Sequence, residues 1–148
     1  MTADVFAAWQ AYQRMRVLLN GQINRELSRT TGLSEADYEI LFYLDRSPER
    51  SVRSIALRCG LAWEKSRLSH QLRRMEQRGL IEKAPGALIR LTDHGREQIS
   101  AARSCYEAAV RRHFGDVLTA DQLAVLTTIA ERVVATLPGD ERHAAEAG

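Results

Sequence analysis

The sequence is poor in the residues and motifs that build disulfide, redox and metal sites. Its two cysteines, Cys59 and Cys105, lie far apart and form no CxxC pair. The four histidines are scattered, and no HExxH motif occurs. We therefore expect neither a disulfide framework nor a dedicated metal site. Cys59 is expected to pack as a small apolar residue between helices.

Long apolar runs and nucleotide-binding glycine motifs are also missing. No segment approaches the roughly 18 apolar residues that cross a bilayer. The first residues, MTADVFAAWQAYQRMR, lack the basic segment, apolar core and cleavage site of a signal peptide. No glycine-rich phosphate loop and no nucleophile elbow is present. We therefore expect a cytoplasmic protein that does not associate with membranes, is not an enzyme and needs no cofactor.

The basic charge is concentrated in the middle third of the chain. The 148 residues carry a net charge of only +2. Between Arg50 and Arg90, however, there are ten Lys/Arg and three Glu, a local charge of +7, so the rest of the chain carries about −5. This asymmetry favours a module that binds a polyanion, although a solvated arginine-rich surface would give the same count.

Apolar spacing predicts a mainly helical single domain over residues 1–148. A first helix is expected from about residue 4 to residue 31, ended by Gly32. Ser34 and Asp37 have the spacing of a capping box for a second helix, which should stop before Ser47-Pro48. The first helix is too long for a compact core of this size, so we expect it to pack on a partner.

The middle of the chain predicts two short helices and a hairpin. A third helix around residues 55–59 should be followed by a tight turn at Gly60-Leu61 and by a fourth helix that Gly79 closes. A helix, a short turn and a second helix with basic residues make a helix-turn-helix arrangement. Two weakly alternating segments, 80–83 and 87–91, predict a small β-hairpin.

The end of the chain predicts two more helices. Thr92 is placed to cap a long fifth helix, and Thr119 with Gln122 has the spacing of a capping box for a sixth. Pro138-Gly139 should end the sixth helix. The remaining residues, 139–148, are expected to be disordered.

The fourth helix has an apolar side and a basic side. At about 100° per residue, Leu68, Leu72 and Met75 form one stripe. The opposite stripe has guanidinium, imidazole, amide and hydroxyl groups and contains no acid, and such groups contact base edges and phosphates in a major groove. The predicted DNA-binding residues are Lys65, Ser66, Arg67, Ser69, His70, Arg73 and Arg74. Arg67 is expected to contact a base and Arg74 a phosphate.

The chain resembles the multiple antibiotic resistance regulator (MarR) family of bacterial winged-helix transcription factors. The similarity rests on SIALRCGLAWEKSRLSHQLRRMEQRGLI, LIRLTDHGRE and VRRHFGDVLTADQLAVL, in the family's order, and extends from Trp9 to Leu137. It implies a winged helix-turn-helix lobe at 34–96 and dimerisation helices at 1–33 and 97–138. It also implies a homodimer that binds a palindromic site in double-stranded DNA, most often as a repressor.

The wing departs from the family's pattern. The family's hairpin is longer and usually bears an Asp-x-Arg pair at its tip, which EKAPGALIRL lacks. Lys83 and Arg90 are then the candidate wing contacts. The departure leaves a second hypothesis open, a winged-helix protein-interaction module with weak or lost DNA binding.

The resemblance also implies a small aromatic effector, an acid or a phenol. Its cleft would lie between the dimerisation helices and the DNA-binding lobe. Trp9, Tyr12, Arg16 and Tyr38 are the candidate cleft residues. Aromatic residues at helical spacing more often serve core or dimer packing, so both interpretations stay open here.

Overall fold

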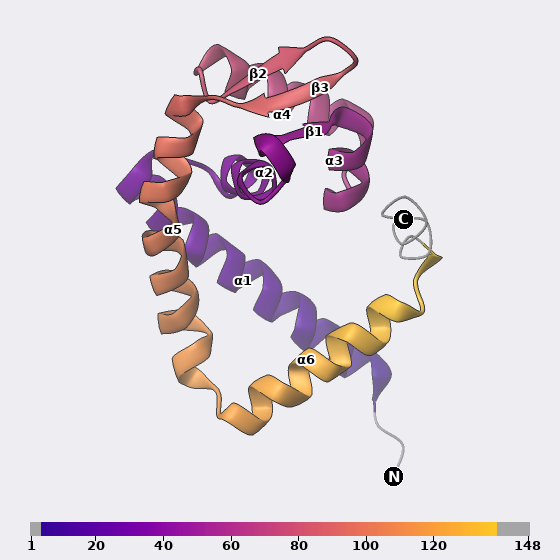
Figure 1. Ribbon diagram of the computed structural model, residues 1–148. Coiled ribbons are helices and arrows are strands. Elements are labelled where there is room, and N and C mark those ends of the chain that lie inside the picture. The colour runs from indigo at the N-terminus through magenta and orange to yellow at the C-terminus, as the bar shows by residue number, and fades with distance from the viewer. Residues whose placement is uncertain (1–3, 139–148) are drawn as a thin grey trace.

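The computed structural model describes residues 4–138, and in this part of the chain helices dominate around one small antiparallel sheet (Figure 1). The result is the mainly helical winged helix expected from the sequence. The elements in chain order are α1 (Val5–Thr31), α2 (Glu35–Asp45), η1 (Pro48–Arg50), β1 (Ser51–Arg53), α3 (Ser54–Leu61), α4 (Lys65–Gln77), β2 (Ile81–Ala84), β3 (Leu88–Leu91), α5 (Asp93–His113), η2 (Gly115–Val117) and α6 (Ala120–Ala135). The predicted disordered tail, 139–148, lies outside the described residues.

Side-chain caps begin α2 and α6, and a left-handed glycine ends α1, largely where the sequence predicts. The capping box of Ser34 and Asp37 is present at the start of α2, and that of Thr119 and Gln122 at the start of α6. Gly32 ends α1 in the left-handed conformation, with φ of 77°. The α6 helix ends at Ala135, earlier than the predicted stop. These boundaries follow from residues close together in sequence, which is why they are predictable.

The predicted turn at Gly60-Leu61 is wrong. Both residues belong to α3, and Ala62 makes the turn instead, in the left-handed conformation with φ of 56°. Gly60 makes room for the Tyr43 ring, because a Cβ there would lie 2.5 Å from Cε2 of Tyr43 and the ring would have to shift. The prediction for Cys59 is also wrong, because its side chain is exposed on α3 and does not pack between helices.

The sheet contains one more strand than the predicted hairpin. Strands β2 and β3 pair as expected, and β1 adds to the other edge of β3, giving the order β1-β3-β2. With three residues, β1 is too short to show an alternating pattern. Its pairing with β3 fixes the start of α3 against the hairpin, because Ser54 N donates to the carbonyl of Ala87 at 2.8 Å.

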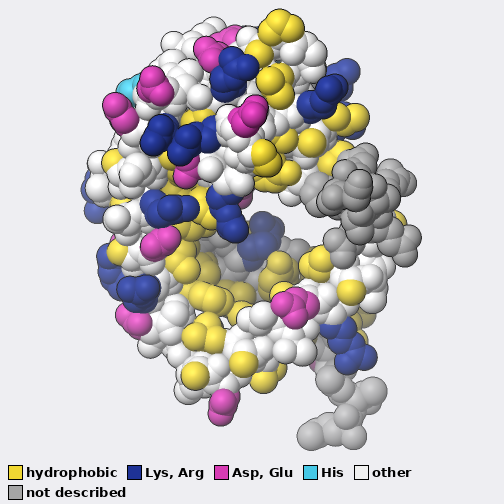
Figure 2. All heavy atoms as spheres, in the orientation of Figure 1, with side chains coloured by type: hydrophobic (Ala, Val, Ile, Leu, Met, Phe, Trp, Pro, Cys, Tyr) yellow, Lys and Arg dark blue, Asp and Glu magenta, His cyan; other side chains and the backbone are white. Residues whose placement is uncertain are grey.

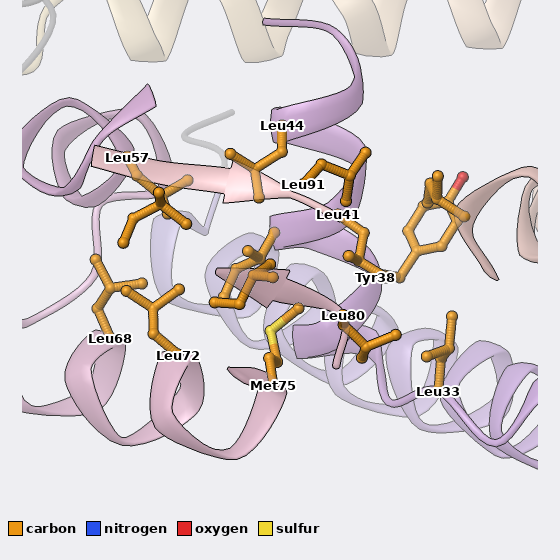
Figure 3. Packing of buried hydrophobic residues seen from close by; sticks show 14 of the residues in the cluster. Leu33, Tyr38, Leu41, Leu44, Leu57, Leu68, Leu72, Met75, Leu80 and Leu91 are labelled. Atoms are coloured by element: carbon orange, nitrogen blue, oxygen red, sulfur yellow. The ribbon is translucent and has the colours of Figure 1, made fainter. Parts of the chain in front are cut away.

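The core lies between α2, α4 and the sheet. Leu68, Leu72 and Met75 point from α4 into this core, as predicted (Figure 3). They meet fully buried side chains from the neighbouring elements, including Leu41, Leu44, Leu57, Leu80 and Ile81. Because the apolar side of α4 is held by this core, its opposite side is presented to solvent.

The end of α4 is tied to the start of α5. Leu80 N donates to the carbonyl of Met75 at 3.0 Å across Gly79, whose φ is 73°. The Thr92 hydroxyl lies 2.6 Å from the Gly79 carbonyl oxygen and 3.0 Å from that of Leu80. A Cβ at Gly95 would lie 2.1 Å from the Leu80 oxygen, so only glycine allows this approach. The L-T-x-x-G motif is therefore the joint between the two helices.

The long helices α1 and α5 pack on each other below the winged lobe, and α6 crosses back under them (Figure 1). None of the described residues of α6 is buried. Hydrophobic side chains gather around the hollow that these helices enclose (Figure 2). Among residues 4–138, no helix combines the length and apolar character needed to cross a membrane.

Candidate nucleic-acid interface

Most of the predicted DNA-binding residues lie together on the solvent side of α4. A shallow hollow is lined by Lys65, Ser66, Ser69, His70 and Arg73, all of which are exposed. Glu64, the residue before the helix, also lines it. The structure thus brings ammonium, guanidinium, imidazole and hydroxyl groups to one surface, with a single carboxylate at its edge. These groups donate and accept hydrogen bonds of the kinds that phosphates and base edges offer.

Arg67 does not share this hollow. Its guanidinium carbon lies 3.9 Å from the centroid of the Trp63 ring, a close cation–π contact. Trp63 is buried and belongs to the segment between α3 and α4. Burial and Glu35 raise the pKa of Glu39 on α2, and the Arg67 guanidinium offsets part of this rise. Arg67 is therefore held on the Trp63 ring, outside the hollow.

Arg74 is held by a buried polar network that sequence reasoning missed. Arg74 donates to Oε1 of Gln71 at 2.9 Å, and Nε2 of Gln71 donates to Oδ1 of Asp37 at 2.6 Å. Arg78 donates to Oδ2 of the same carboxylate at 2.7 Å, and Ser34 N donates to it at 2.9 Å. Asp37 is 2% exposed and Gln71 5%. Buried polar groups require such partners, so the network fixes α4 against the start of α2.

A signal for this network was present in the sequence. Gln71 occupies the apolar stripe of α4, between Leu68 and Leu72. A glutamine in that stripe needs a buried hydrogen-bond partner, because an unpaired amide there would be destabilising. The sequence shows the need for a partner. It does not show that Asp37, which already serves the capping box, is that partner.

The two candidate wing residues have different surroundings. Lys83 is exposed on β2. Arg90 on β3 lies 3.4 Å from the carboxylate of Glu82, with both side chains about half exposed. Such a surface pair is weak and screened by salt. The turn of the hairpin is tight, with φ of 81° at Gly86 and 56° at Ala87. Within residues 4–138, Lys83 therefore has no ion-pair partner, whereas Arg90 is paired with an acid.

The four predicted cleft residues are not brought together. Tyr38 lines a cavity of about 430 Å³ between α2, α3 and α5. Trp9, Tyr12 and Arg16 do not line it in this chain and are exposed on α1. Trp9 and Tyr12 contact each other, with ring centroids 5.7 Å apart. The full lining of the cavity is Tyr38, Glu39, Phe42, Tyr43, Gly60, Leu61, Trp63, Tyr106 and Glu107.

The cavity has aromatic walls. The rings of Tyr38 and Tyr106 stack with centroids 4.1 Å apart, and Phe42 stacks on Tyr38 at 5.8 Å. Burial raises the pKa of Tyr38 to about 12, and burial together with Glu35 and Glu39 raises that of Tyr106. Both phenols are therefore neutral near neutral pH. The walls present flat apolar faces with hydroxyl groups at their edges, which suits an aromatic guest.

Comparison with known proteins decides the family. A sequence model described as the MarR family matches residues 31–88, which include all of α2, α3 and α4. AbsC, a MarR family transcriptional regulator from Streptomyces coelicolor, is 32% identical, with a TM-score of 0.84 over 94% of this chain and 97% of that one. The chain belongs to the MarR family. A comparison with curated protein sequences gave no match.

Two further MarR family regulators from Streptomyces coelicolor extend this finding. Sco3205, solved in complex with DNA, is 30% identical with a TM-score of 0.84, over 93% of this chain and 90% of that one. Sco5413 is 24% identical with a TM-score of 0.76, over 88% and 94% of the two chains. At that identity the second likeness concerns the fold alone. The MarR fold therefore extends over nearly the whole chain, the long terminal helices included.

Proposed function

We propose that this MarR family protein binds double-stranded DNA through the exposed side of α4 and regulates transcription, as a repressor rather than as an enzyme. The observation that carries the proposal is the hollow in which Lys65, Ser66, Ser69, His70 and Arg73 converge. The proposal is also supported by the similar protein Sco3205, whose structure was solved in complex with DNA. In helix-turn-helix proteins the second helix of the motif enters the major groove, and α4 occupies that place.

We propose further that the protein is a homodimer that binds a palindromic site. Apolar side chains are exposed along the first half of α1 and along α6, among them Phe6, Trp9, Val125, Ile129 and Val133. Met15 of α1 and Ile129 of α6 also line one apolar groove. A partner's helices would remove these surfaces from water, and a two-fold axis would impose an inverted repeat on the DNA.

The aromatic cavity is the proposed site of a small aromatic effector that releases DNA. It lies between the winged lobe and α5, so a guest would contact both parts of the chain. Trp63 lines the cavity and also supports Arg67 on the first turn of α4. A guest that moves Trp63 would therefore disturb the DNA-binding helix. In this proposal the protein acts in the cytoplasm, where its DNA and its effector meet.

The alternative is a winged-helix protein-interaction module. The short wing and the pairing of Arg90 with Glu82 favour it, because they leave little free positive charge on the hairpin. In this alternative the hollow on α4 would contact an acidic protein surface, and affinity for duplex DNA would be weak.

Selection of bound sequences from a random duplex pool, followed by a salt titration, separates the two. We expect an enriched inverted repeat with half-sites about one helical turn apart. Its affinity should fall steeply with salt, because each neutralised phosphate releases counterions. Sedimentation should give about 33 kDa, twice the chain mass of 16.7 kDa. No enrichment above a random pool would favour the protein-interaction module, and a monomer that binds a single half-site fully would exclude the palindrome.

A further inference from the structure

The charge of the aromatic cavity points to a different guest from the acids and phenols that the family resemblance implies. Two of its lining residues, Glu39 and Glu107, are acidic, and among the described residues that line it none is basic. Among the lining residues, a carboxylate guest would therefore meet two carboxylates and no cation. Electrostatic complementarity therefore disfavours an anion and favours a cation.

The two carboxylates differ in their surroundings. Glu107 lies 3.9 Å from Arg103, at the limit of an ion pair. Glu39 has no ion-pair partner within 4.0 Å among residues 4–138. It is half-buried on α2, and burial together with Glu35 raises its pKa. Glu39 is thus a partly desolvated carboxylate that lines the cavity and forms no close ion pair, although Arg67 offsets part of the effect of burial.

The rings around the cavity already hold cations within the chain. Arg67 lies 3.9 Å from the Trp63 ring centroid, and Arg46 and Arg103 lie 5.2 and 5.6 Å from that of Phe42. These contacts are made by the rings of two lining residues. The negative face of an aromatic ring attracts a cation, and quaternary ammonium groups are recognised in aromatic cages for this reason. Aromatic rings and the Glu39 carboxylate therefore line one cavity.

We propose that this cavity binds an organic cation that carries an aromatic ring, with its ammonium group at Glu39 and its ring against the walls of Tyr38, Trp63 and Tyr106. The volume of about 430 Å³ is within the range of ligand pockets, roughly 300–1,000 Å³. The proposal names the chemical class of the effector and so rests on the effector site proposed above. It does not depend on DNA binding.

Calorimetry on the full-length protein without DNA tests the proposal, with phenyltrimethylammonium, its neutral isostere tert-butylbenzene, and benzoate as probes. We expect the cation to bind at least about tenfold more tightly than benzoate. Glu39→Gln should lower the affinity for the cation by about tenfold and leave the affinity for the neutral isostere unchanged. Glu97→Gln, which removes the same charge from an exposed position on α5, is the matched control and should change neither.

Three results would overturn the proposal that the cavity binds an aromatic cation. These are benzoate binding as tightly as the cation, no binding of the cation, and unchanged affinity for the cation in Glu39→Gln. The isosteric replacement of a half-buried glutamate should leave the fold intact, which circular dichroism of the variant checks. Because no DNA is present, failure here leaves the DNA-binding proposal standing. Conversely, a protein that bound the cation but no duplex would contradict only the proposed function.

Discussion

Apolar residues recur at the same spacing in the winged lobe and in the terminal helix α6, but they are buried in the lobe and not in α6. In the lobe, Leu41, Leu44, Leu57 and Met75 are fully buried. In α6, none of the described residues is buried, although apolar residues recur at three- and four-residue intervals there too. Periodicity therefore predicts that a helix has an apolar side. Whether the same chain covers that side depends on what the tertiary fold places against it.

The boundary between buried and exposed apolar residues lies in the middle of α1. Ile23 and Leu27 in its second half are buried, and this part of the helix packs on α5. In its first half, Phe6 is 76% exposed and Trp9 56%. One continuous helix thus belongs to a closed core at one end and offers an open apolar surface at the other. The following variants test whether that difference reflects a partner.

The largest effect is expected inside the lobe. Leu72→Ala should lower the free energy of unfolding by roughly 2–5 kcal/mol, because it leaves a cavity under α4. Urea unfolding measures the loss. The loss should be the same in an Ile129→Lys background, because the two sites share no partner. A loss that disappears in that background would show that the lobe core depends on α6.

On the terminal helices, Ile129→Lys should weaken association by roughly 2 kcal/mol or more, about 30-fold, because it places a charge in the proposed dimer interface. The side chain is 52% exposed in the single chain, so the monomer should stay folded. Thr127→Lys places the same charge on the opposite side of α6 and is the control. Equal sedimentation of the two variants would remove α6 from the interface.

On α4, the contrast is between two arginines of equal charge. Arg73→Ala should cost roughly 1–3 kcal/mol on the selected DNA site, because Arg73 lies in the exposed hollow. Arg67→Ala should cost less, because its guanidinium is held on Trp63. Titration of labelled duplex measures both, and Arg111→Ala on α5 controls for the loss of charge. A larger effect of Arg67 than of Arg73 would mean that Arg67 leaves Trp63 when DNA binds.

The smallest effect is expected at Glu39 of α2, which lines the cavity between the winged lobe and α5. Burial raises the pKa of Glu39, so the folded protein binds this proton more tightly than the unfolded chain. The contribution of Glu39 to stability is therefore present in acid and lost as pH rises through its folded-state pKa. Glu39→Gln should raise the melting temperature near neutral pH and change it little in acid. Thermal melts at both pH values measure this, and a uniform shift would contradict it.

Sequence reasoning predicted the helices and their caps because those features depend on neighbours in the chain. Ser34 with Asp37, and Thr119 with Gln122, are three residues apart and bond to each other's backbone. The resemblance to the MarR family added the winged fold, which the comparisons confirmed.

What the sequence did not predict depends on residues that only the fold brings together. Strand β1 exists through its pairing with β3, far along the chain. Asp37 meets Gln71 and Arg78 because α4 crosses the start of α2. The aromatic cavity likewise needs α2, α3 and α5 at once, so Tyr38 alone could be named in advance. The position of Arg67 on Trp63 could not be inferred from its angle on the helix.

The joint at Thr92 and Gly95 has a mechanical consequence. Since the segment after α4 is bonded to the start of α5, a tilt of α5 would be transmitted to the end of α4. The α5 helix has 21 residues and is about 30 Å long, so a tilt of about 5° at one end displaces the other by about 3 Å. At the C-terminal end of α5, Glu26 of α1 forms hydrogen bonds with Arg112 and His113. In the proposed dimer, a small rotation there would change the distance between the two copies of α4, and hence the preferred spacing of the half-sites.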